Sequence, residues 1–129
     1  MTNPVWVPLR AIIVIHDRQI ARHGGAPGLR DLALLEMGCA RAMNLAAYTE
    51  ANLSGIAAAY AFGLTKAHAF VDGNKRTAFV TALTFLRLNG MSFRPDPVKG
   101  VRMMEDLATD DVSDAQVEQW FEFGMKPVV

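Results

Sequence analysis

The sequence predicts an all-α protein, a compact bundle of six helices around two buried central ones. Apolar residues recur at helical spacing in segments that glycine and proline separate, and the period-two alternation of half-buried strands is scarce. The segment from Ile56 to Leu64 is apolar on all sides, and a second segment is equally apolar from Phe79 to Leu86. Such all-round apolarity is typical of helices in the middle of a bundle.

The first two helices are expected over residues 8–23 and 29–47, where apolar residues recur at helical spacing. Residues 24–28 contain three glycines and a proline, so they form a turn whose interior cannot be helical. Asp31, near the start of the second helix, suits the positive end of the helix dipole.

The two central helices are expected over residues 52–66 and 74–88. Asn89-Gly90 has the pattern of a helix stop with a left-handed C-cap, and residues 91–94 are expected to form a short extended link.

Capping signals place the last two helices. Asp96 suits an N-cap with Pro97 at the first helical position, and Ser113 with Gln116 fits a capping box for a helix that ends near Gly124. The aromatic residues near the C-terminus are expected to pack the sixth helix as one stripe: Trp120, Phe121 and Phe123.

Composition and charge narrow the class of protein. A chain of 129 residues is expected to form one domain, residues 1–129. The 13 basic and 13 acidic residues give a net charge of zero, which argues against direct nucleic-acid binding. The single cysteine, Cys39, argues against a disulfide framework or a cysteine-rich zinc site. The apolar runs are too short for a membrane span, and the N-terminus lacks a signal-peptide pattern, so we expect a cytoplasmic protein without a membrane partner.

One short stretch between the two most apolar helices is rich in polar chemistry. Gly73 permits a tight turn and the close approach of a ligand. The free N–H groups of the following helical turn, residues 74–77, favour an anion such as phosphate, and Lys75 and Arg76 add charged donors. We therefore expect an anion-binding site at the start of the fourth helix.

Two further residues of this stretch complete a set for group transfer. Asp72 is a hard oxygen ligand beside the anion site, where a carboxylate usually shares Mg²⁺ with phosphates. His68 could take a proton from a hydroxyl nucleophile. Each of these residues is common in a structural role when alone, and their joint occurrence is what favours phosphoryl or nucleotidyl transfer.

The stretch His68-Ala-Phe-Val-Asp-Gly-Asn-Lys-Arg76 resembles the signature of the Fic/Doc family, H-x-F-x-D/E-G-N-G/K-R. The resemblance extends to the death-on-curing (Doc) branch of that family and covers residues 15–93. The other segments that carry it are Arg22–Asp31, Leu35-Glu36 and Thr77–Gly90. It implies a six-helix bundle of the Fic/Doc type.

The resemblance implies a chemistry that depends on three positions. Fic enzymes transfer AMP and carry the longer motif G-N-G-R-x-x-R, whereas the Doc branch transfers the γ-phosphate of ATP. Here Lys75 replaces the second glycine and Phe79 replaces the final arginine, and both departures favour the Doc chemistry. Gly73, where some Doc proteins carry alanine, leans toward Fic.

Roles for individual residues follow from the same resemblance. His68 would be the general base, Asp72 would hold Mg²⁺, and the ATP phosphates would be bound by Gly73, Asn74, Lys75 and Arg76. The flanking residues Arg22, His23, Arg30 and Asp31 either lie near the mouth of the site or form solvated helix ends.

The function implied is that of a toxin from a bacterial toxin–antitoxin pair. It would use ATP and Mg²⁺ to phosphorylate a Thr or Ser hydroxyl of elongation factor Tu, which blocks translation and arrests growth. A Phd-like antitoxin would cover the site with a segment that is disordered until it binds. Two alternatives stay open, a Fic-type AMP transferase that acts on another protein and a catalytically silent binding module of the same fold.

Overall fold

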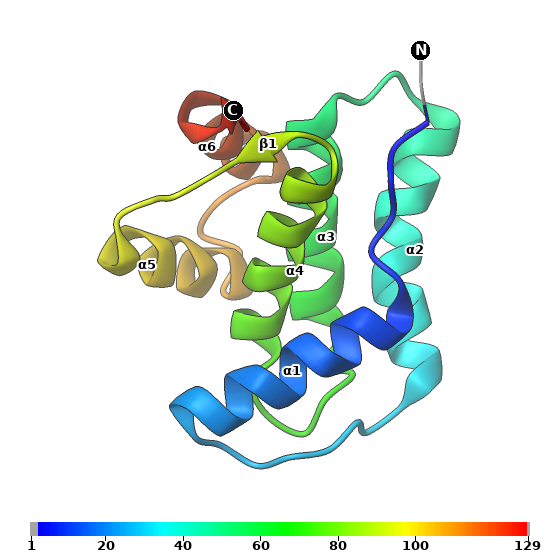
Figure 1. Cartoon of the computed structure of the whole chain (residues 1–129), viewed down its shortest axis with the longest axis vertical. Helices are drawn as coiled ribbons and strands as arrows, with labels where there is room; N and C mark the ends of the chain where they lie inside the picture. The colour runs from blue at the N-terminus through cyan, green and yellow to red at the C-terminus, as the bar shows by residue number, and fades with distance from the viewer. Residues whose placement is uncertain (1–2, 129) are drawn as a thin grey trace.

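The computed structural model describes residues 3–128 and has the expected all-α architecture (Figure 1). The helices are α1 (Leu9–His23), α2 (Leu32–Tyr48), α3 (Leu53–Ala67), α4 (Asn74–Leu88), α5 (Pro97–Ala108) and α6 (Asp114–Gly124). Two short strands, β1 (Met91–Ser92) and β2 (Lys126–Pro127), pair antiparallel with Met91 opposite Pro127. Among the described residues, none of the helices combines the length and the apolar character needed to cross a membrane.

Helix α3 lies at the centre of the molecule, between α2 and α4 (Figure 1). Every residue from Ser54 to Thr65 is buried, which confirms the prediction from its all-round apolar sequence. Gly38 of α2 and Gly63 of α3 face each other so closely that a Cβ atom on Gly63 would overlap the carbonyl oxygen of Gly38. The absence of side chains at these positions therefore sets the distance between the two helices.

Helix α4 packs on α3 along one face only. Its buried residues recur at helical spacing: Thr77, Ala78, Thr81, Ala82, Phe85 and Leu86. Phe79, Val80 and Leu83 are partly exposed on the other side. The buried face of α4 is therefore narrower than expected from a sequence as apolar as that of α3. These apolar side chains also line two hollows in the surface, while Phe79 and Leu83 pack against the edge of the core.

The N-caps predicted for α5 and α6 are confirmed, and the start of α2 differs from the prediction. Asp96 accepts a hydrogen bond from the Lys99 N–H, and the capping box of Ser113 and Gln116 is complete. Helix α2 starts at Leu32, three residues later than expected, because Asp31 is its N-cap. The backbone before it, at Leu29, pairs instead with Phe70, more than thirty residues away in the sequence.

One residue of the predicted aromatic stripe on α6 does not pack. Phe121 is fully buried and Trp120 is partly buried, and both rings contact Phe93. Phe123 is 85% exposed, so its expected role in packing the helix is wrong. Residues two apart on an α-helix point to nearly opposite sides, and Phe121 already occupies the buried side.

Candidate active site

The motif forms the loop that connects the two helices of the core. His68 is the C-cap of α3 and Gly73 is the N-cap of α4, with φ values of 50° and 74°. Both lie in the left-handed region, which glycine adopts freely but which costs a residue with a Cβ atom about 1 kcal/mol or more. The conformation of His68 must therefore be held by its surroundings.

Asn74 locks the middle of the loop with its side chain. Its Oδ1 atom accepts a hydrogen bond from the N–H of Phe70 at 3.0 Å, and its Nδ2 atom donates to the carbonyl of the same residue at 2.9 Å. The Phe70 ring is buried, as expected of a residue that anchors the loop in the core. These two bonds fix the direction of the Asn74 amide, and the Asn74 backbone N–H is left to bind a ligand.

The first turn of α4 presents free N–H groups at the start of the helix. The N–H of Thr77 bonds the carbonyl of Gly73 at 3.0 Å, while those of Asn74, Lys75 and Arg76 make no hydrogen bond to any described residue. Together with the helix dipole, three free donors favour a bound anion. The exposed side chains of Lys75 and Arg76 add positive charge at the same place.

His16 of α1 supports the loop from beneath, and sequence reasoning overlooked it. Its ring is 1% exposed and stacks on Phe70 with 3.9 Å between ring centroids. Its Nε2 atom lies 2.8 Å from the carbonyl oxygen of Asp72, which can only accept, so Nε2 carries the proton. A signal was present, because His16 falls four residues from both Ile12 and Ile20 on the apolar stripe of α1.

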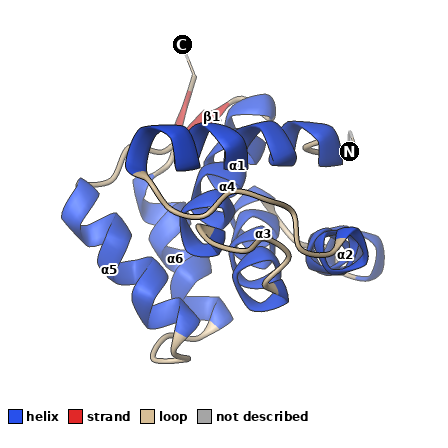
Figure 2. Ribbon diagram, turned by 90° about the horizontal axis from the view of Figure 1, so that it is seen from below, coloured by secondary structure: helices blue, strands red, loops and turns tan. Residues whose placement is uncertain are grey.

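The glycine-rich segment between α1 and α2 runs beside the motif loop (Figure 2). The N–H groups of Arg30 and Asp31 donate to the carbonyl of Ala69, and the N–H of Val71 donates to the carbonyl of Gly28. The guanidinium of Arg30 also bonds the His68 carbonyl. This segment therefore adjoins the candidate site, and the Arg30 side chain contacts the motif loop rather than only solvent.

The Asp72 carboxylate is exposed and oriented by backbone donors. Its Oδ2 atom accepts a hydrogen bond from the Ala26 N–H at 3.1 Å, and its Oδ1 atom accepts one from the Gly73 N–H at 2.8 Å. These two bonds, the one from Ala26 foremost, hold the pKa of Asp72 below its ordinary value. A Cβ atom at Gly25, which has a φ of 119°, would lie 2.7 Å from Asp72 Oδ2, so the close approach requires glycine.

One cleft of about 830 Å³ collects all of the site residues that the sequence predicted. Its polar end is formed by His68, Asp72, Gly73, Asn74, Lys75 and Arg76. Helices α4 and α5 contribute an apolar part of its wall: Phe79, Val80, Pro97, Gly100, Val101 and Met104. Polar side chains of α1, α3 and α5 also line the wall: Gln19, His23, Thr65, Lys66 and Glu105. The cleft therefore joins a proton acceptor, a carboxylate and an anion site to an apolar surface, an arrangement suited to phosphoryl or nucleotidyl transfer.

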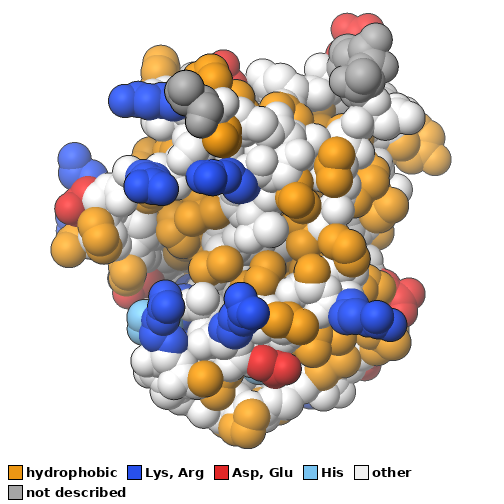
Figure 3. Space-filling model, viewed as in Figure 1, with side chains coloured by type: hydrophobic (Ala, Val, Ile, Leu, Met, Phe, Trp, Pro, Cys, Tyr) orange, Lys and Arg blue, Asp and Glu red, His pale blue; other side chains and the backbone are white. Residues whose placement is uncertain are grey.

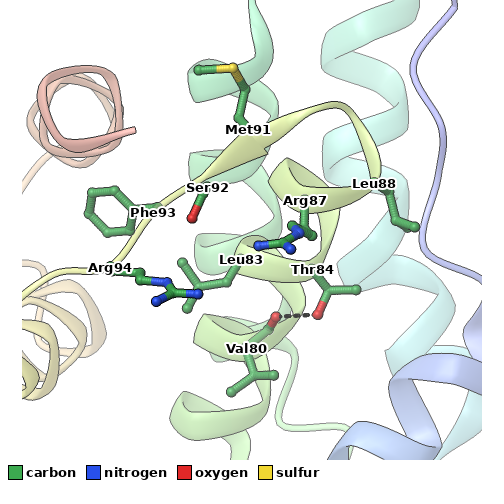
Figure 4. Close-up of a pocket in the computed structure, with 9 residues that line it drawn as sticks. All are labelled: Val80, Leu83, Thr84, Arg87, Leu88, Met91, Ser92, Phe93 and Arg94. Carbon is green, nitrogen blue, oxygen red and sulfur yellow. Dashed lines mark hydrogen bonds between the residues drawn. The ribbon is translucent and has the colours of Figure 1, made fainter. Parts of the chain in front are cut away.

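A smaller groove of about 390 Å³ lies between α4 and β1 (Figure 4). It contains none of the predicted site residues. Its lining is apolar except for Thr84, Ser92, Arg87 and Arg94, and Val80 lines both this groove and the cleft. On the face shown in Figure 3, apolar side chains gather over α4 and Lys and Arg side chains border them.

Comparison with known proteins agrees with the geometry. The sequence profile of the Fic/DOC family matches residues 6–86, more than half of the chain. "Protein kinase doc" of Escherichia phage P1 is 39% identical over 87 residues, which span 67% of this chain and 69% of that protein. "Toxin Doc" of Mycolicibacterium smegmatis is 38% identical over 92 residues, 68% of this chain and 71% of that protein. The chain described here belongs to the Fic/Doc family.

Proposed function

We propose that this chain is a Doc-type toxin that transfers the γ-phosphate of ATP to a Thr or Ser hydroxyl of elongation factor Tu and so blocks translation. The observation that carries the proposal is the meeting of His68, Asp72 and the free N–H groups of α4 in one cleft. The names of the two relatives, a protein kinase and a toxin, support the same activity.

His68 is the general base of the proposed reaction. Its imidazole is exposed, lines the cleft and takes the proton of the target hydroxyl as the hydroxyl oxygen bonds to the γ-phosphorus. ADP leaves, and the proton remains on the imidazole. The N–H groups of residues 74–76, with the side chains of Lys75 and Arg76, bind the phosphates and neutralise the charge of a loose transition state.

Asp72 fits the role of Mg²⁺ ligand. Mg²⁺ in phosphate sites is held by one or two carboxylates, and the phosphates and water complete its shell. The Asp72 carboxylate is ionised at neutral pH, since its pKa is lowered further from an already acidic ordinary value, and it lies beside the proposed phosphate site. When bound there, Mg²⁺ would neutralise phosphate charge and orient the phosphate oxygens.

Lys75 and Phe79 favour transfer of phosphate over transfer of AMP. Lys75 occupies the position where Fic enzymes leave space for phosphates with a glycine. Phe79 occupies the position of their final arginine and provides no charge to a nucleotide. Its ring stacks on Trp120 with 5.9 Å between ring centroids.

An antitoxin of the Phd kind is the proposed partner, because a toxin must be silenced in the cell that makes it. The groove between α4 and β1 adjoins the cleft at Val80, and Arg87 and Arg94 border its apolar surface. Such a surface suits an acidic and apolar segment that folds on binding and reaches the cleft.

A transfer assay tests the proposed activity. The purified chain is mixed with elongation factor Tu, Mg²⁺ and ATP labelled at either the α or the γ phosphate, and intact mass follows the target. We expect γ label and one added phosphate, with the rate reduced at least about 100-fold in His68→Ala. An α label would establish AMP transfer instead, and no modification with either label would favour a binding module.

A further inference from the structure

His68 has an uncommon backbone conformation, and a residue outside the motif bonds its carbonyl oxygen. A histidine at φ 50° is disfavoured by its own Cβ atom, and the His68 side chain makes no hydrogen bond to a described residue that could fix it. The direction of the imidazole therefore depends on what restrains the backbone at this position.

Arg30 makes two hydrogen bonds to a single backbone atom of His68. Its Nε and one terminal nitrogen donate to the carbonyl oxygen of His68 at 3.0 and 2.7 Å. This carbonyl lies at the C-terminal end of α3, where the helix dipole favours a positive charge. Donors on a charged group are also stronger than neutral ones, and the planar guanidinium fixes the direction of both bonds.

Arg30 is itself anchored to the next residue of the loop. Its backbone N–H and that of Asp31 donate to the carbonyl of Ala69 at 2.7 and 3.1 Å. Arg30 does not line the cleft and bonds none of residues 72–76. The hydrogen bonds of its side chain thus reach only His68 among the described residues, and none reaches the proposed phosphate and Mg²⁺ sites.

We propose that Arg30 is a positioning residue, which holds the backbone of His68 in the left-handed conformation and so aims the imidazole into the cleft. The catalytic role of that imidazole rests on the proposed function. The backbone restraint does not, and it can be measured without any transfer of phosphate.

The kinetic test compares Arg30→Met and Arg30→Lys with Arg10→Met, a matched change at an exposed arginine of the first turn of α1. Because a small misplacement of a catalytic group is costly, we expect Arg30→Met to lower kcat about 10-fold or more per folded molecule. The KM for ATP should stay within about 2-fold, because residues 72–76 are unaffected.

Arg30→Lys should recover part of kcat, and Arg10→Met should match the wild type. A lowered melting temperature with unchanged kcat would assign Arg30 a merely structural role and overturn the proposal.

The second measurement is made by nuclear magnetic resonance on the same proteins without nucleotide. The HN–Hα coupling and carbon shifts of His68 should report positive φ in the wild type and Arg10→Met, and lose that signature in Arg30→Met. An unchanged His68 signature in Arg30→Met overturns the proposal, whether or not the wild type phosphorylates anything. A wild type that transfers no phosphate but shows the expected change at His68 removes the proposed function and supports the restraint by Arg30.

Discussion

Helix α3 and the loop that follows it are held in place by different interactions. Residues 54–65 of the helix are buried on every side by α2, α4 and α6. In the loop from His68 to Gly73 only Ala69 and Phe70 are buried, and its shape depends on hydrogen bonds from Arg30, Asn74 and His16. Apolar packing therefore fixes the positions of the helices, and a few hydrogen bonds fix the conformation of the loop that carries the candidate site. Substitutions in the two regions should separate stability from activity.

The largest effect on stability is expected from Phe85→Ala in the packed region. The Phe85 ring is fully buried and lies 5.3 Å from the Tyr60 ring, centroid to centroid. Its truncation should lower the free energy of unfolding by about 4 kcal/mol, measured by urea denaturation. Transfer per folded molecule should not change. Phe123→Ala is the matched control, and because that ring is 85% exposed it should cost less than about 0.5 kcal/mol. Equal costs at the two positions would contradict the importance given to packing.

A smaller loss of stability and a larger loss of activity are expected from His16→Leu. Leucine keeps an apolar side chain beneath Phe70 but removes the donor to the Asp72 carbonyl. The free energy of unfolding should fall by about 1 kcal/mol, while transfer falls about 10-fold as the loop relaxes. His16→Gln, which keeps an N–H donor of similar reach, should recover part of the transfer rate. If both variants transfer phosphate at the wild-type rate, the loop does not depend on this bond.

The smallest effect concerns the pH dependence of stability at Asp72. Hydrogen bonds from Ala26 and Gly73 lower the pKa of Asp72 from its ordinary value of 3.8 in the folded protein. The stability that this carboxylate contributes is therefore fully present above pH 3.8 and is lost as the pH falls through the lowered pKa. Asp72→Asn, which cannot titrate, should show a shallower fall in the free energy of unfolding below about pH 4. Parallel curves for the two proteins would show that the backbone bonds do not act on the carboxylate in solution.

Features that depend on neighbouring residues could be predicted from the sequence. The N-caps at Asp96 and Ser113 and the left-handed stop at Gly90 involve partners within four residues. The candidate site was predictable for the same reason, because its six residues fall within nine consecutive positions, on the loop before α4 and in its first turn. The central position of α3 could likewise be predicted, because a helix that is apolar on all sides is stable only when it is buried on all sides.

Which distant residues contact that site depends on how the chain folds. Arg30 lies 38 residues from His68, and His16 lies 56 residues from Asp72. The packing of the helices also leaves Phe79 and Val80 of α4 partly exposed in the wall of the cleft, although the sequence of α4 is as apolar as that of α3. The helices and the chemical groups of the motif could be predicted from the sequence, since they follow from local backbone preferences and the order of side chains. The orientation of those groups required the folded chain, because a hydrogen bond forms only where packing brings a donor within about 3 Å of its acceptor.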